Sequence, residues 1–210
     1  MQDPFGGMYR MNGRVRVEMT SERWRCPILL IFAALLTSRV AAGQVINVSI
    51  CNLGGLSASV VRRAEVETQA VFHSPGIRIR WAACDQASPP PWFTIRLRGD
   101  RPPATAGATS LDAMGRAFLA GDGSGYMADA YIVAVQELSG RDGSDAGVLL
   151  GVVIAHELGH LLLGPGHTRD GVMRASWGDR ELKALSQRWL TFNAAQRGRM
   201  QTLLSGVAVR

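Results

Sequence analysis

The chain has 210 residues, of which 47% are hydrophobic and 19% are charged. This composition supports a folded core and excludes disordered and collagen-like chains. The formal net charge is +6, but residues 43–210 hold 17 basic and 14 acidic side chains and a single lysine, Lys183. Because no run of basic residues interrupts this part of the chain, we expect no nucleic-acid partner.

The first 42 residues have the pattern of an export signal. Arg23 and Arg25 precede an apolar segment of ten residues, 27–36, and small residues around Ala42 suit a signal peptidase. Ten apolar residues are too few to cross a hydrocarbon layer of about 30 Å, so we expect no stable membrane anchor. The sequence therefore predicts a signal peptide over residues 1–42, a single domain over residues 43–210, and a secreted or periplasmic protein.

The first part of the predicted domain reads as strand, helix and strand. Residues 45–50 and 77–81 alternate in polarity as strands do, and residues 57–73 place apolar side chains at helical spacing. A short strand–helix–strand unit forms a crossover between parallel strands, whose C-terminal ends meet at one edge. Cys51 and Cys84 follow those ends, and an exported protein tends to oxidise such a pair. We predict a Cys51–Cys84 disulfide.

The later elements alternate less regularly. We expect a third strand at 93–97, a short edge strand at 116–120, a buried strand at 130–135, an apolar helix at 146–163, and two short helices at 179–189 and 194–204. Together these elements predict an α+β fold with a mixed, mostly parallel sheet, one long buried helix and a C-terminal helical part.

The long helix carries the segment His156-Glu157-Leu158-Gly159-His160. Histidines four residues apart lie on one helix face, so both imidazoles can bind the same ion. Zinc accepts such nitrogens, and a catalytic site leaves one position to water. Glu157, next to the first histidine, is placed to take a proton from that water. We predict Zn²⁺ as cofactor, with His156 and His160 as ligands and Glu157 as general base.

The chain after this helix resembles the metzincins, whose pattern is His-Glu-x-x-His-x-x-Gly-x-x-His followed by a turn that bears methionine. Gly164 lies one residue later than the pattern requires, and His167 is late by the same residue. Gly164 and Gly166 tolerate unusual backbone dihedrals and can absorb this difference. The resemblance implies a zincin fold, His167 as third zinc ligand, and Met173 as a Met-turn residue beneath the metal.

The same resemblance implies a zinc metalloprotease that cleaves peptide or protein substrates, and the export signal predicts that this enzyme is secreted. In that family an edge strand binds the extended substrate, and residues 116–120 are the candidate here. His73 is interpreted as a histidine at a helix C-terminus, where the helix dipole favours it, and not as a ligand.

Three alternatives stay open at the level of sequence. Glu181, 21 residues after His160, would complete a gluzincin-like site, and Asp170 is a weaker candidate that suits a turn better. A zinc hydrolase could instead act on another amide, such as a cell-wall peptide. A secreted binding module could hold zinc for structure alone, but such a site has no use for Glu157.

Overall fold

The computed structural model describes residues 43–84, 92–102, 113–187 and 189–207, which lie in one compact unit, Ala42–Arg210. The predicted signal peptide, residues 1–42, lies outside the described residues. In chain order the elements are β1 (Gln44–Asn52), α1 (Ala58–His73), β2 (Ile77–Ala83), β3 (Trp92–Arg98), β4 (Gly115–Phe118), β5 (Met127–Tyr131), α2 (Ile132–Asp142), α3 (Ala146–Leu163), α4 (Asp179–Ser186) and α5 (Ala194–Val207).

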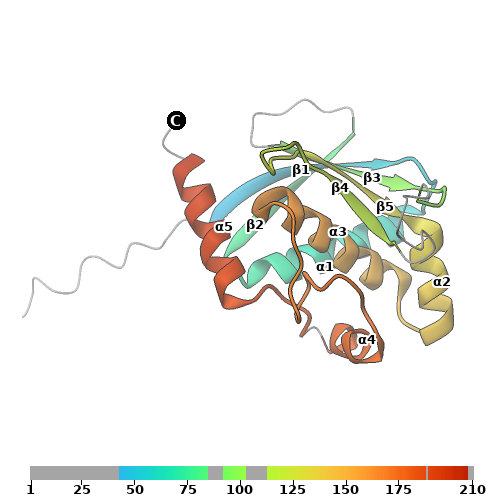
Figure 1. Cartoon of the computed structure of the whole chain (residues 1–210). Coiled ribbons are helices and arrows are strands. Elements are labelled where there is room, and N and C mark those ends of the chain that lie inside the picture. Colours follow the sequence, from blue (N-terminus) through green and yellow to red (C-terminus); the bar gives the residue numbers. More distant parts are fainter. Residues whose placement is uncertain (1–42, 85–91, 103–112, 188, 208–210) are drawn as a thin grey trace, which may run out of the picture. The chain divides into compact units, whose positions relative to one another are not determined.

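The five strands form one sheet in the order β2-β1-β3-β5-β4 (Figure 1). Strand β1 pairs in parallel with β2 and β3, and β3 pairs in parallel with β5. Strand β4 runs antiparallel to β5 and is the last strand in this order. The predicted mixed, mostly parallel sheet is confirmed, and the predicted edge strand at 116–120 is β4.

The core lies between one face of the sheet and two helices, α1 and α3 (Figure 1). Ile46, Val48, Ile95 and Leu97 alternate along β1 and β3 and are fully buried, as expected for the covered face of a sheet. The two helices approach closely at Gly151, where an added Cβ would lie 2.6 Å from the backbone oxygen of Ala64. This close packing fixes the position of α3 beneath the sheet.

Helix α3 begins and ends where the sequence predicts. The Asp145 side chain caps it by accepting hydrogen bonds from the N–H groups of Gly147 and Val148 at 2.8 and 3.0 Å. Among the described helices, α3 alone is long and apolar enough to cross a membrane, but 78% of it is buried inside the protein. Its apolar character is that of a helix through the core.

One predicted element is wrong. The apolar segment 130–135 was expected to be a strand, but β5 ends at Tyr131 and helix α2 begins at Ile132. Tyr131, the N-cap residue, makes no side-chain capping hydrogen bond, so the sequence lacks the usual signal for a helix start. A short run of β-branched and small residues does not separate strand from helix by its period.

The predicted disulfide is present. Cys51 lies near the end of β1 and Cys84 directly follows β2, with their Cα atoms 4.6 Å apart. Because β1 and β2 are adjacent parallel strands, their C-terminal ends bring the two cysteines together. The disulfide therefore links the C-terminal ends of the two strands that the β1–α1–β2 crossover connects.

Candidate metal centre

Three histidines converge at the end of α3. His156 and His160 share one face of the helix, and their Nε2 atoms are 3.1 Å apart. His167 comes from the segment after the helix, and its Nε2 atom is 3.3 Å from that of His160. A ligand atom from each of the three lies within 4.8 Å of the others. The structure thus brings together all three residues that the sequence nominated as zinc ligands.

Backbone carbonyls orient two of these rings. Nδ1 of His156 lies 2.7 Å from the carbonyl oxygen of Val172, and Nδ1 of His160 lies 3.3 Å from that of Gly164. A carbonyl oxygen only accepts, so each Nδ1 carries the proton and donates it. Each neutral ring then directs the lone pair of Nε2 at the shared centre, which is the tautomer that metal ligation requires.

The charge state of the rings also suits a metal. Burial lowers the pKa of His156 to about 4 against the opposing effect of the Val172 carbonyl. Burial also lowers the pKa of His160, opposed by the Gly164 carbonyl, while the neighbouring His167 lowers it further. Both imidazoles are therefore neutral at physiological pH, as metal ligands must be.

The spacing of the nitrogens fits zinc. Zn–N bonds of about 2.0–2.1 Å at tetrahedral angles separate two ligand nitrogens by about 3.3 Å, and the observed separations are 3.1 and 3.3 Å. Two neutral acceptors at this distance repel each other unless a cation or a proton lies between them. Two of the separations among these nitrogens therefore match those in a zinc site.

The one extra residue between His160 and His167, relative to the metzincin pattern, is accommodated by the backbone at two glycines. Helix α3 ends at Leu163, and Gly164 follows with φ 81° and ψ −169°. Gly166 has φ 116°, a backbone conformation that residues other than glycine rarely adopt. The two positive φ angles redirect the chain after the helix, so that the ring of His167 returns to the other two.

Glu157 projects from α3 toward strand β4, where its side chain lies against the Gly115 position. Its side chain is only 5% exposed. Burial raises the pKa of its carboxyl to about 8, although a hydrogen bond from the backbone N–H of Ala117 acts to lower it. A cation bound by the neighbouring histidines would favour the ionised carboxylate, so the group is placed to exchange a proton near neutral pH.

Met173 and Trp177 complete the surroundings of the histidines. Met173 is 1% exposed, and a Cβ added at Gly159 would collide with its sulfur. The ring of Trp177 meets that of His156 edge to face, with centroids 5.9 Å apart. No sequence motif marks Trp177, which follows Met173 in an irregular segment.

The competing ligand candidates lie elsewhere. The Glu181 carboxylate accepts hydrogen bonds from Arg174 at 2.5 Å and from the backbone N–H of Gly178 at 3.1 Å. Asp170 lies in a turn, where its carbonyl oxygen accepts a hydrogen bond from Thr168. His73 is the exposed last residue of α1. Among the described residues, the group of possible metal ligands contains none of these three.

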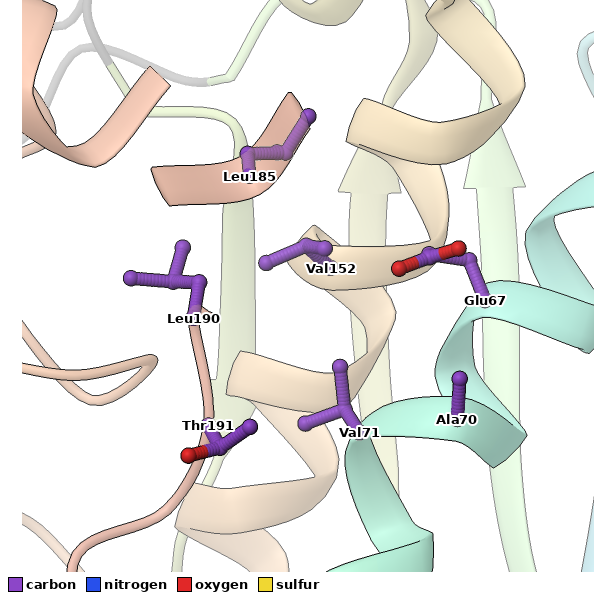
Figure 2. A pocket seen from close by; sticks show the side chains of 7 residues that line it. All are labelled: Glu67, Ala70, Val71, Val152, Leu185, Leu190 and Thr191. Carbon is purple, nitrogen blue, oxygen red and sulfur yellow. The ribbon is translucent and has the colours of Figure 1, made fainter. Parts of the chain in front are cut away.

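A separate cavity of about 190 Å³ lies between α1, α3 and the segment after α4 (Figure 2). Figure 2 shows Glu67 among the apolar side chains of Val71, Val152, Leu185 and Leu190. None of the three histidines lines this cavity, so it is distinct from the candidate metal centre.

Comparison with known proteins supports the fold. No protein-family model and no curated protein sequence matches the chain. The chain is similar to the crystal structure of archaemetzincin from Methanopyrus kandleri, with a TM-score of 0.51 and 16% sequence identity. The match covers 79% of this chain and 99% of that chain. At this identity the likeness shows a shared α+β architecture, consistent with the archaemetzincin fold.

Proposed function

We propose that the chain is a zinc-dependent metallopeptidase. The observation that carries the proposal is the convergence of ligand atoms from His156, His160 and His167, on a helix that also carries the buried Glu157 directly after His156. A structural zinc site is closed by four protein ligands, whereas a catalytic site has three. The similarity in fold to an archaemetzincin supports the same class of activity.

Each residue has a defined task in this reaction. His156, His160 and His167 hold the ion through Nε2, and the Val172 and Gly164 carbonyls fix two of the rings. A zinc ion held there would supply Lewis acidity, which would lower the pKa of a water molecule and polarise the substrate carbonyl. The Glu157 carboxylate accepts the proton of the attacking water and afterwards delivers it to the leaving amine.

Met173 serves as the hydrophobic floor of the site in this proposal. Its buried side chain lies against Gly159, between the two helix histidines in sequence. The Thr168 N–H donates to the Met173 carbonyl at 2.9 Å, which closes the turn that follows His167. A tightly packed turn beneath the histidines restricts their motion and keeps their geometry constant.

The substrate is an extended peptide that adds to strand β4. Among the described strands β4 is the last in the sheet, and it contacts α3, which carries the histidines. Main-chain hydrogen bonds to such an edge supply affinity without requiring a particular sequence. We also propose export of the protein, on the basis of the signal-like residues 1–42 and the disulfide between Cys51 and Cys84.

The test compares zinc-loaded wild type with Glu157→Gln on a mixed peptide library. We expect the variant to retain one zinc per chain and to lose about 10²–10⁴-fold in kcat, the usual contribution of a general base. Zinc content is read by elemental mass spectrometry and cleavage by product mass. Equal cleavage by both proteins would refute the role of Glu157, and zinc binding without cleavage by wild type would favour a non-catalytic module.

A further inference from the structure

Alternate residues of β4 direct their backbone groups away from the sheet. The Tyr131 N–H donates to the Met114 carbonyl at 2.9 Å, and Gly115 is the next residue along β4. In an antiparallel ladder, hydrogen-bonded and non-hydrogen-bonded pairs alternate. The N–H and C=O groups of Gly115 and Ala117 therefore face the outer edge of β4.

Glu157 reaches this same edge. The backbone N–H of Ala117 lies near its carboxylate and favours the ionised form. At Gly115, an added Cβ would lie 2.7 Å from both Cγ and Cδ of Glu157 and closer still to Oε1. These separations are shorter than real Cβ contacts show. The Glu157 side chain thus occupies the space that any side chain at position 115 would fill.

We propose that Gly115 is a positioning residue for the hydrolytic reaction, which sets the place of the Glu157 carboxylate by having no side chain. This inference rests on the proposed peptidase function and adds to it. Gly115 is not among the described glycines with a positive φ angle, so the backbone itself does not require glycine there. Glycine inside a strand weakens it unless another group approaches closely, and here that group is the proposed base.

The arrangement links the base to substrate binding. The Ala117 N–H faces the Glu157 carboxylate. The Gly115 backbone groups and the Ala117 carbonyl lie on the same outer edge, where an added peptide strand would pair with them. A substrate strand added to β4 would then lie alongside the carboxylate that acts on it. One short strand therefore orients both the peptide and the proton acceptor.

A methyl group at position 115 should move the carboxylate and leave the strand in place. The carboxylate is the far end of a flexible side chain, whereas Gly115 is paired with Ala130 in the sheet. A misplacement of about 1 Å at a reacting group can lower the rate about 100-fold. We expect Gly115→Ala to fold and bind one zinc, with some loss of thermal stability from crowding against Glu157, and to lose about 100-fold in kcat with KM little changed.

The matched control is Gly121→Ala, in the connection between β4 and β5, where an added Cβ meets no atom within 4 Å. Its kcat and zinc content should equal those of wild type. Gly115→Ala is also combined with Glu157→Gln. Since both changes act through one carboxylate, the double variant should be no slower than Glu157→Gln. A full additional loss in the double variant, or wild-type kcat in Gly115→Ala, would overturn the proposal.

A spectroscopic measurement separates this proposal from the peptidase function itself. In cobalt-substituted protein, the visible absorption reports the groups around the metal, whether or not a substrate is cleaved. We expect Gly115→Ala to shift the wild-type spectrum toward that of Glu157→Gln, while Gly121→Ala leaves it unchanged. If wild type cleaves no peptide, the peptidase proposal fails. The spectrum alone then shows whether Gly115 sets the position of the Glu157 carboxylate. A wild-type spectrum in Gly115→Ala then overturns the positioning role.

Discussion

Gly159 and Met173 are in such close contact that no side chain fits between them. A Cβ at Gly159 would collide with the Met173 sulfur and approach Phe192 Cε1 at 3.0 Å. Gly159 lies between His156 and His160 in the helix, so the turn that bears Met173 is packed directly against the helix turn that presents both rings. This contact joins the C-terminal part of the chain to the candidate metal centre.

Replacing Gly159 with alanine should therefore weaken the fold. Overpacking a filled core usually costs about 1–3 kcal/mol, and Met173 is 1% exposed, so its side chain has little room to move. We expect the free energy of unfolding of metal-free Gly159→Ala to fall by this amount in a urea titration. The control is Gly198→Ala in α5, where a Cβ meets nothing within 4 Å and alanine should stabilise the helix by about 1 kcal/mol. Unchanged stability in Gly159→Ala would show that the contact is loose.

Removing His167 should abolish stoichiometric zinc binding. Loss of a partner that only orients a ligand typically lowers metal affinity about 10–100-fold, and loss of a ligand should lower it further. We expect His167→Ala to lose its metal on dialysis, as measured by elemental mass spectrometry. Glu181→Ala should retain one zinc per chain, because Arg174 and Gly178 engage that carboxylate. The reverse pattern would restore the gluzincin-like alternative.

The disulfide should make a large contribution to stability. Cys51 and Cys84 are 33 residues apart in sequence. Closing a loop of that length lowers the entropy of the unfolded chain and so raises its free energy by about 3–4 kcal/mol at 25 °C. We expect the double variant Cys51→Ser/Cys84→Ser to lose stability by this amount in denaturant titrations. Wild type under reducing conditions should show the same loss. Equal stability with and without reductant would contradict this prediction.

The ion pair of Glu181 with Arg174 should make the free energy of unfolding depend on pH in the acidic range. Burial acts to raise the pKa of Glu181, but hydrogen bonds from Gly178 and Arg174 outweigh it and hold the pKa below its usual value. A lowered folded-state pKa stabilises the fold above the unfolded value of about 4.3, and this stabilisation is lost as the pH falls through the folded-state pKa. We expect Glu181→Gln to flatten the decline in unfolding free energy below about pH 4.3.

The measurement is a series of denaturant titrations of metal-free protein between pH 7 and pH 3. Asp179→Asn is the control, since it removes a neighbouring carboxylate from the same helix and keeps the pair between Glu181 and Arg174. Its acid dependence should match that of wild type. If the unfolding free energies of wild type and Glu181→Gln fell in parallel with pH, the ion pair would not contribute to the acid dependence of stability.

The amino-acid sequence by itself determined the parts whose signals are local. Asp145 as N-cap and the glycines after Leu163 delimit α3, and its two histidines follow from helical periodicity alone. The strand–helix–strand unit and the pairing of Cys51 with Cys84 also follow from local patterns, because a parallel crossover brings its ends to one edge. Helix α2 was missed because no capping residue marks its start.

Only the tertiary structure decided what depends on several elements at once. Whether His167 or Glu181 approaches the helix histidines depends on the backbone path at Gly164 and Gly166, and their positive φ angles direct His167 inward. The relation of Gly115 to Glu157 joins an edge strand to a core helix, and Trp177 reaches His156 from beyond the methionine turn. Such contacts arise from packing between segments distant in sequence, which no periodicity within one segment records.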